Sequence, residues 1–295
     1  MEFIAFTEAY SRPLENASHV ALRKATEGAT LAGWRVVGIP DDFEGIDAAR
    51  DAIAHLPDFT EGAVGAWIGF VPGPEKYALF YQAAAEKGIR LLNGPTQYQF
   101  AQEFHRYYPL INEFTALSEV VDSAEALERI SVPYPIFVRG SVQSKKYLGL
   151  NACLANNLDE LRTLVTALLA NHERSRDHVI LRQYRPLRHV QMHQGFPQGR
   201  EFRAFVLDGK VLAMGYYWQQ ADPLQHLDSL EEAVVRSLAE KVARLVPSRW
   251  IALDIGQAET GEWWVIELGD AQFSGTATLT QFQVFSQLRQ TLLPS

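Results

Sequence analysis

Short apolar runs alternate with helical segments through the first 92 residues, and this alternation constrains the fold more than any other feature of the chain. The apolar runs lie at 3–6, 34–40, 63–71 and 89–92, and the segments 22–31, 47–56 and 77–87 between them favour helices. Strands that alternate with helices predict a mostly parallel sheet covered by helices. No GxGxxG motif follows these runs, so a dinucleotide site is not supported.

The rest of the chain has a different pattern, rich in hairpins as well as helices. It predicts helices at 96–107, 123–130, 158–170 and 230–245, and strands at 135–139, 178–184, 201–207, 210–217, 250–255 and 262–268. Asp208-Gly209 is typical of a tight hairpin turn, and residues 185–200 are expected to be a loop. The turn Asn93-Gly94-Pro95 marks the boundary between the two patterns. At 295 residues the chain should form two to three structural units, an α/β one followed by α+β ones.

Charge and composition limit the partners of the chain. The formal net charge is −8, which opposes binding to nucleic acid at long range. The single cysteine, Cys153, excludes an intrachain disulfide and fits a reducing compartment. We see neither a signal peptide nor a run of about 18 apolar residues, so a cytoplasmic protein without a membrane span is expected. A homodimer is the commonest assembly for such a chain.

Two acids stand inside apolar strands near the C-terminus. Asp254 lies in Ala-Leu-Asp-Ile, and Glu267 lies in Val-Ile-Glu-Leu. Burying a carboxylate alone costs several kcal/mol, so such residues usually have a partner, and a divalent cation is a natural partner for two carboxylates on paired strands. The alternative is that each acid points to solvent or pairs with a basic side chain.

Basic residues follow two of the predicted strands. Arg139 ends one strand and precedes a Gly/Ser-containing turn with Lys145 and Lys146, which could wrap a phosphate chain or could be a solvated hairpin tip. Glu201 and Arg203 share one face of a later strand because they are two residues apart. A cation beside carboxylates and lysines is typical of phosphoryl-transfer sites, where metal and fixed cations neutralise charge.

The order of these elements resembles the ATP-grasp superfamily over about residues 93–275. Strand 135–139 is similar to the family strand whose last residue contacts nucleotide phosphates, with Arg139 where lysine is usual, as in one divergent branch of the superfamily. Residues 140–149 look like the loop over the phosphates, and residues 179–184 are similar to the hinge strand that holds adenine.

The resemblance also reaches the two C-terminal strands. Asp254 and Glu267 match the family's magnesium ligands in residue type, strand and separation. The family has an asparagine two residues after the glutamate, but here Gly269 stands at that position. We therefore expect the adjacent Asp270 to be the third ligand of Mg²⁺.

The resemblance implies an α/β N-terminal domain at 1–94, an ATP-grasp N-terminal subdomain with the nucleotide hinge at 95–184, and a C-terminal subdomain with the metal site at 185–295. The implied nucleotide-binding residues are Arg139, Lys145, Lys146, Arg182, Gln183, Tyr184 and Glu201. The implied catalytic residues are Arg203, Lys145 and Lys146.

The implied function is an ATP- and Mg²⁺-dependent carboxylate–amine or carboxylate–thiol ligase that forms an acylphosphate on a small-molecule or peptide substrate. The absent asparagine and a hinge without the usual glutamate motivate an alternative, a nucleotide-binding module or phosphotransferase without ligase activity. A third possibility is an interaction protein in which the buried acids are paired internally.

Overall fold

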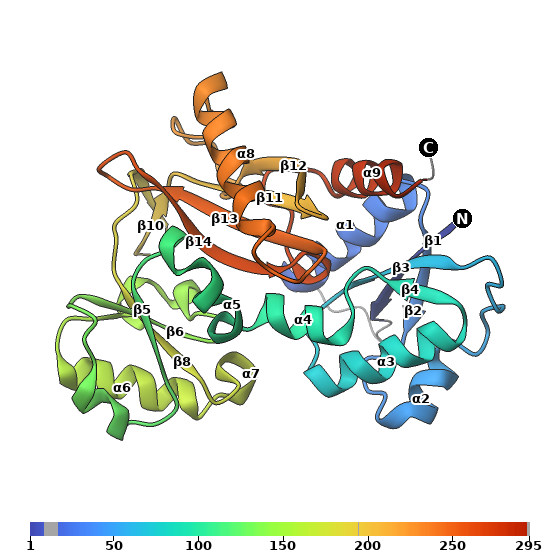
Figure 1. Cartoon of the computed structure of the whole chain (residues 1–295), viewed down its shortest axis with the longest axis horizontal. Coiled ribbons are helices and arrows are strands. Elements are labelled where there is room, and N and C mark those ends of the chain that lie inside the picture. Colours follow the sequence, from blue (N-terminus) through green and yellow to red (C-terminus); the bar gives the residue numbers. More distant parts are fainter. Residues whose placement is uncertain (9–16, 194, 294–295) are drawn as a thin grey trace.

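The computed structural model describes residues 1–8, 17–193 and 195–293. Its N-terminal lobe is a parallel sheet in the order β2-β1-β3-β4. The strands are β1 (Glu2–Glu8), β2 (Arg35–Ile39), β3 (Ala63–Ile68) and β4 (Ile89–Leu91), and the helices are α1 (Ala17–Leu31), α2 (Gly45–Ala52) and α3 (Pro74–Glu86). All six residues of β3 are buried, as expected for a strand covered on both faces. The predicted parallel sheet is confirmed (Figure 1).

The middle lobe is an antiparallel sheet in the order β5-β8-β6-β7. It comprises β5 (Ser118–Val121), β6 (Ile136–Gly140), β7 (Leu154–Ala155) and β8 (Val179–Gln183), with helices α6 (Leu158–Leu169) and α7 (His172–Ser175). Helix α6 buries Leu161, Val165 and Leu168, whose spacing places them on one face of the helix. Residues 123–130 were expected to form a helix, but the structure has only the 3-10 helix η2 (Glu125–Arg129) there.

The C-terminal lobe is a second antiparallel sheet, in the order β12-β11-β13-β14. Its strands are β11 (Glu201–Leu207), β12 (Lys210–Tyr216), β13 (Trp250–Gln257) and β14 (Trp263–Asp270). Helix α8 (Ser229–Ala243) begins at a capping box with Asp228 and buries Val235, Ala239 and Val242 against one face of this sheet. The opposite face is therefore left to meet the other two lobes.

Two short helices connect the lobes (Figure 1). They are α4 (Pro95–Gln102) and α5 (Phe104–Ile111), and the 3-10 helix η1 (Asn112–Phe114) follows. One continuous helix was expected at 96–107, but Glu103 has an extended backbone and divides it. The division lets α5 turn its buried Phe104, Tyr107 and Ile111 into the core of the C-terminal lobe.

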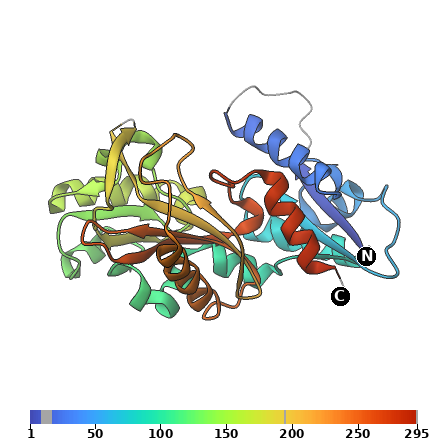
Figure 2. The same ribbon diagram turned by 90° about the horizontal axis from the view of Figure 1, so that it is seen from above.

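The structure corrects the sequence interpretation in two further segments. Residues 185–200 are not a plain loop, because they contain the hairpin of β9 (His189–His193) and β10 (Phe196–Gly199). A last helix, α9 (Gln281–Leu292), was not foreseen, and it lies beside α1 (Figure 2). A Cβ atom at Gly28 would clash with that of Gln281, so glycine permits this close crossing.

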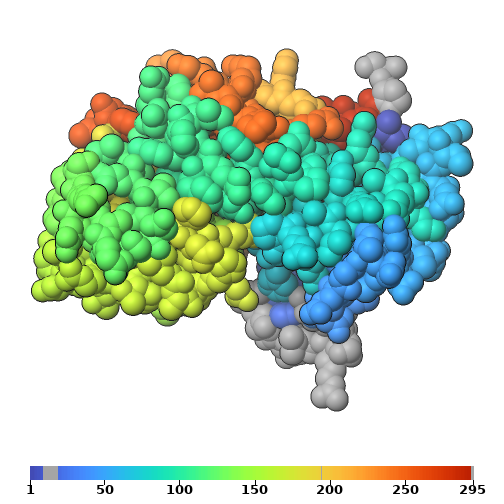
Figure 3. Space-filling model, turned by 60° about the horizontal axis from the view of Figure 1, so that its bottom comes forward, coloured from blue at the N-terminus to red at the C-terminus, as the bar shows by residue number. Residues whose placement is uncertain are grey.

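Helix α9 therefore returns the C-terminal part of the chain to the N-terminal lobe. Figure 3 shows the middle lobe, in green to yellow, next to the N-terminal lobe, in blue to cyan. Within the described ranges, no helix is both long and apolar enough to cross a membrane.

Candidate active site

One row of side chains crosses three strands of the C-terminal sheet. Arg203 on β11 is opposite Asp254 on β13, and Asp254 is opposite Glu267 on β14. The guanidinium of Arg203 donates two hydrogen bonds of 2.7 Å to the carboxylate of Asp254, which is only 2% exposed. The alternating side chains of a strand place this row on the face away from α8.

The middle lobe supplies a second arginine to this row. Arg139 at the end of β6 is buried, and its guanidinium donates to the carboxylate of Glu267 at 2.7 Å and to the carbonyls of Gly140 and Val142. Burial raises the pKa of Glu267, but Arg139 and then Lys146 outweigh it and hold that pKa below its usual value. Glu267 is therefore ionised and joins the two lobes.

The two neighbouring lysines point to different places. Lys146 begins the 3-10 helix η3 (Lys146–Leu148), and its ammonium donates to the hydroxyl of Tyr217 at 2.8 Å, close to the ring of Trp218. Burial lowers the pKa of Lys146, but the charges of Tyr217, Glu201 and other neighbours raise it above its usual value. Lys145 instead donates to the carbonyl of Ala167 on α6. The structure thus brings Lys146 to the row of acids and leaves Lys145 outside it.

Glu201 is a third acid on the same sheet face, two residues before Arg203. It is 3% exposed, and its Oε1 has no hydrogen-bond partner. Burial raises the pKa of Glu201 to about 7, with Lys146 opposing the rise and Asp254 adding to it. An unpartnered buried oxygen beside a lysine can accept a hydrogen bond from a bound molecule.

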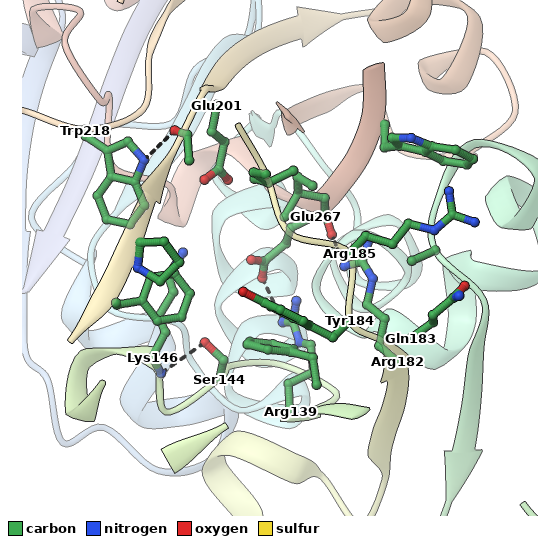
Figure 4. A pocket seen from close by; sticks show the side chains of 18 residues that line it. Arg139, Ser144, Lys146, Arg182, Gln183, Tyr184, Arg185, Glu201, Trp218 and Glu267 are labelled. Atoms are coloured by element: carbon green, nitrogen blue, oxygen red, sulfur yellow. Dashed lines mark hydrogen bonds and ion pairs between the residues drawn. The ribbon is translucent and has the colours of Figure 1, made fainter. Parts of the chain in front are cut away.

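Two cavities meet at this row. Apolar and aromatic side chains dominate the first, which we call the base-side cavity, and Figure 4 shows Glu201, Glu267 and Lys146 lining it together. The second, the polar cavity, contains Arg203, Asp254 and Arg174. Ser144, Lys146 and Glu267 line both cavities, so they form the passage between them.

Asp270 is not brought to this row. It is fully buried, and its carboxylate accepts hydrogen bonds from the side-chain amide of Asn93 and the backbone N–H of Gln272, both at 2.9 Å. Burial raises the pKa of Asp270 to about 7. Because it is three residues after Glu267, it lies on the opposite face of β14. The expected third metal ligand therefore lies in an internal network that joins β14 to the N-terminal lobe.

The predicted hinge lines the base-side cavity, but its groups are already engaged. The N–H of Gln183 donates to Leu117, and the N–H of Tyr184 donates to Pro135. Arg182 donates to Thr115 at 2.6 Å and to backbone carbonyls of β14. Burial lowers the pKa of Arg182 to about 10. Arg182 thus ties the two sheets together, while the side chains of Gln183 and Tyr184 remain at the cavity wall.

Several residues of the two cavities were missed in the sequence. Arg185 lies 4.0 Å from the ring centre of Trp264, and both line the base-side cavity with Trp218. Arg174 on α7 donates to the carbonyl of Ser144 at 2.7 Å and lines the polar cavity. The Tyr217-Trp218 pair directly after a strand was the one available signal, since Tyr and Trp suit places where an apolar wall meets a polar group.

The comparison with family profiles decides the classification. The profile of an ATP-grasp domain, the third family of its clade, matches residues 112–288, which is more than half of the chain. The chain belongs to this ATP-grasp family. The matched range contains β6, β8, β11, β13 and β14, the strands that carry the arginines and acids described above.

Solved structures with the same fold cover nearly all of the chain. They include a RimK domain ATP-grasp protein from Sphaerobacter thermophilus (14% identity, TM-score 0.60, covering 99% of this chain and 100% of that one). They also include D-alanine–D-alanine ligase from Bacillus anthracis complexed with ATP (11%, 0.61, 98% and 98%) and L-amino acid ligase from Bacillus licheniformis (14%, 0.61, 97% and 73%). No curated protein sequence matches the chain. At these identities the likeness establishes the ATP-grasp fold.

Proposed function

We propose that the chain is an ATP- and Mg²⁺-dependent ligase that joins a carboxylate to an amine through an acylphosphate. The observation that carries the proposal is the junction of two unlike cavities at Lys146 and Glu267. A nucleotide needs an apolar wall for its base and a charged end for its phosphates. The two substrates that react with the γ-phosphate need a polar space directly beyond that end.

The base-side cavity suits adenosine. It encloses an open volume of about 890 Å³, within the range of sites for ligands of this size. Its walls present flat or apolar side chains to a base, among them Phe137, Tyr184 and Trp218. The free Oε1 of Glu201 is placed to accept from a ribose hydroxyl.

The passage between the cavities suits the phosphates. Arg139, Lys146 and Arg203 supply three positive charges around the row of acids. Cations held by neighbouring side chains neutralise the charge that develops on transferring phosphoryl oxygens and need little rearrangement to do so. We assign Lys146 and Arg139 to the phosphates and Arg203 to the end nearest the reacting carboxylate.

The donor set also fits Mg²⁺. Asp254 and Glu267 are adjacent cross-strand acids, and magnesium in phosphoryl-transfer sites is held by one or two carboxylates with phosphate oxygens and water. No cluster of three or more His, Cys, Asp or Glu side chains able to hold a metal occurs among the described residues, so the phosphates would complete the coordination. When bound, the ion neutralises phosphate charge and polarises the phosphoryl group.

The reaction would take place in the polar cavity. A substrate carboxylate oxygen attacks the γ-phosphorus, the bond to the bridging oxygen breaks, and ADP leaves. The amine then attacks the acyl carbon of the acylphosphate, and phosphate leaves. The named ligases among the structural neighbours, one acting on D-alanine and one on L-amino acids, support chemistry of this class.

Two measurements test the proposal. The thermal unfolding midpoint should rise with ATP and Mg²⁺ and rise less with ATP alone, since a ligand at ~100 times its Kd adds about 2.7 kcal/mol of stability. ADP release should then depend on added carboxylate and amine substrates. No shift with ATP and Mg²⁺ would reject nucleotide binding altogether.

The departures from the family pattern keep one alternative in view. The hinge N–H groups of Gln183 and Tyr184 are already hydrogen-bonded, which motivates a nucleotide-binding module or phosphotransferase without ligase activity. That alternative gives the thermal shift, but no combination of carboxylate and amine stimulates ADP release.

A further inference from the structure

A third cavity lies between the C-terminal sheet and the N-terminal lobe, and we call it the apolar side pocket. Its walls come from α1, the end of β3, α9 and the sheet face that carries the active-site row. Leu22, Ile68, Phe205, Trp250 and Val284 are among its lining residues. Figure 2 shows α1 and α9 side by side along this part of the molecule. The pocket also adjoins the carboxyl end of β3, where open α/β sheets commonly bind ligands.

The pocket continues the active site along a single strand. On β11, Glu201 lines the base-side cavity, Arg203 lines the polar cavity and Phe205 lines the apolar side pocket. These three residues are two apart and therefore share one face, with about 7 Å between successive positions. The apolar side pocket thus begins one step along that face from Arg203.

One turn separates the polar cavity from the pocket. Phe273, Ser274 and Gly275 line both cavities. The guanidinium of Arg203 donates to the carbonyl of Gly275 at 2.7 Å, so the arginine of the active-site row contacts this shared wall directly. A molecule that reacts beside Arg203 can therefore extend past the turn.

The chemistry of the pocket selects an uncharged, apolar occupant. None of its lining residues within the described ranges is an acid, lysine, arginine or histidine. The buried amide of Gln272 is engaged internally, because it accepts from the N–H of Trp67 and donates to the hydroxyl of Tyr77. A charged group placed here would lose its hydration without gaining a partner, whereas apolar groups gain about 25 cal/mol per Å² of buried surface.

We propose that one of the two substrates joined in the polar cavity carries a large apolar side chain, and that this side chain occupies the apolar side pocket. The inference rests on the proposed ligase function and narrows its substrate to an amino acid or short peptide with a large aliphatic or aromatic group. Small or acidic amino acids leave the pocket empty and bind weakly.

A pair of tryptophan variants on α1 tests the inference. Ala21 is exposed at the rim of the pocket, so Ala21→Trp obstructs the pocket without crowding the core. Thr30 is exposed on the same helix nine residues later, and nine residues at 3.6 per turn place it on the opposite side, so Thr30→Trp is the matched control. Both variants should retain the thermal shift with ATP and Mg²⁺.

Free L-phenylalanine, L-leucine and glycine serve as probes, because each carries both a carboxylate and an amine. Saturation-transfer NMR in the presence of Mg²⁺ and a non-hydrolysable ATP analogue should detect L-phenylalanine and L-leucine on the wild-type protein and on Thr30→Trp. Their affinity should exceed that of glycine at least tenfold, and Ala21→Trp should remove most of this difference. Where ADP release is measurable, its selectivity should change in the same way.

The outcomes separate this inference from the proposed function. Equal binding of glycine and L-phenylalanine, absence of any signal from the two apolar probes, or an unchanged preference in Ala21→Trp would each overturn the apolar side pocket. Absence of the thermal shift with ATP and Mg²⁺ in the wild-type protein would instead reject the nucleotide site.

Discussion

The two faces of β14 carry acids that differ in partners and exposure. Glu267 faces the cavities, its side chain is 31% exposed, and it pairs with the guanidinium of Arg139. Asp270 faces the N-terminal lobe, is fully buried, and is held by the amide groups of Asn93 and Gln272. Burial alone therefore does not identify a metal ligand. An acid that can exchange its partner for a metal or phosphate must also reach a cavity.

The sharpest test of this comparison is Glu267→Gln. We expect ADP release to fall about 1,000-fold or more, equivalent to ~4 kcal/mol of transition-state stabilisation, because the amide cannot act as an anionic ligand for Mg²⁺. Glu262→Gln is the matched control, since Glu262 is exposed in the turn before β14. Circular dichroism checks that both variants are folded. Residual ATP-dependent activity above one tenth of wild type would remove Glu267 from the site.

The reciprocal change, Asp270→Asn, should act on stability and leave nucleotide binding intact. Every partner of the Asp270 carboxylate is a donor, and Asn93 cannot turn its amide around because its oxygen accepts from the N–H groups of Arg249 and Trp250. An asparagine at 270 would therefore direct a donor at a donor. A buried donor without an acceptor costs about 1–3 kcal/mol.

Urea unfolding at pH 7 measures this loss, with Asp208→Asn as control. Asp208 pairs with Arg249 at the surface, where replacing one partner should cost less than about 1 kcal/mol. A weakened response to ATP and Mg²⁺ in Asp270→Asn, with stability unchanged, would show that Asp270 belongs to the site after all.

Sequence patterns predicted the lobes better than they predicted the contents of the cavities. Periodicity is a local property, and it sufficed for the parallel sheet of the first lobe and for the Asp208-Gly209 hairpin, whose two turn residues have the positive φ that such turns require. It failed at Glu103, where packing of α5 under the C-terminal sheet overrides a continuous helical pattern. It also failed for α9, whose docking partner α1 is more than two hundred residues away in the chain.

The same distinction holds for the candidate site. The two-residue spacing of Glu201 and Arg203 correctly predicted a common face, because the period of a strand fixes it. The direction of a loop side chain has no such rule, so Lys145 and Lys146 could not be told apart until the structure placed them. Asp270 shows that position along a strand must be counted by parity as well as by proximity.

This lysine pair provides a smaller test of the cavity face. Lys146→Met should weaken binding of a non-hydrolysable ATP analogue about tenfold, or ~1.4 kcal/mol, through loss of one phosphate contact. Lys145→Met should change it less than twofold, because the ammonium of Lys145 points to Ala167. Isothermal titration calorimetry with Mg²⁺ present measures both constants. Equal losses in the two variants would place both lysines at the phosphates.

The smallest expected effect is a pH dependence shared by the two faces of the sheet. The pKa values of Glu201 and Asp270 are each raised to about 7, so the folded protein keeps two protons that the unfolded chain releases near pH 4. The unfolded state then binds fewer protons, and the contribution of both acids to stability falls as pH rises from about 4 through 7. Between pH 6 and pH 7.5 each acid should contribute about 1 kcal/mol of this loss.

Glu201→Gln should therefore remove about 1 kcal/mol of the loss measured in urea between pH 6 and pH 7.5, and Asp270→Asn should remove a similar amount. The two variants part when ligand is added. Mg²⁺ with an ATP analogue brings charge next to Glu201 but does not reach the network of Asp270, so ligand should change only the part that Glu201 contributes. If ligand changed the slope of Glu201→Gln as much as that of the wild type, the unpartnered oxygen of Glu201 would not face the nucleotide.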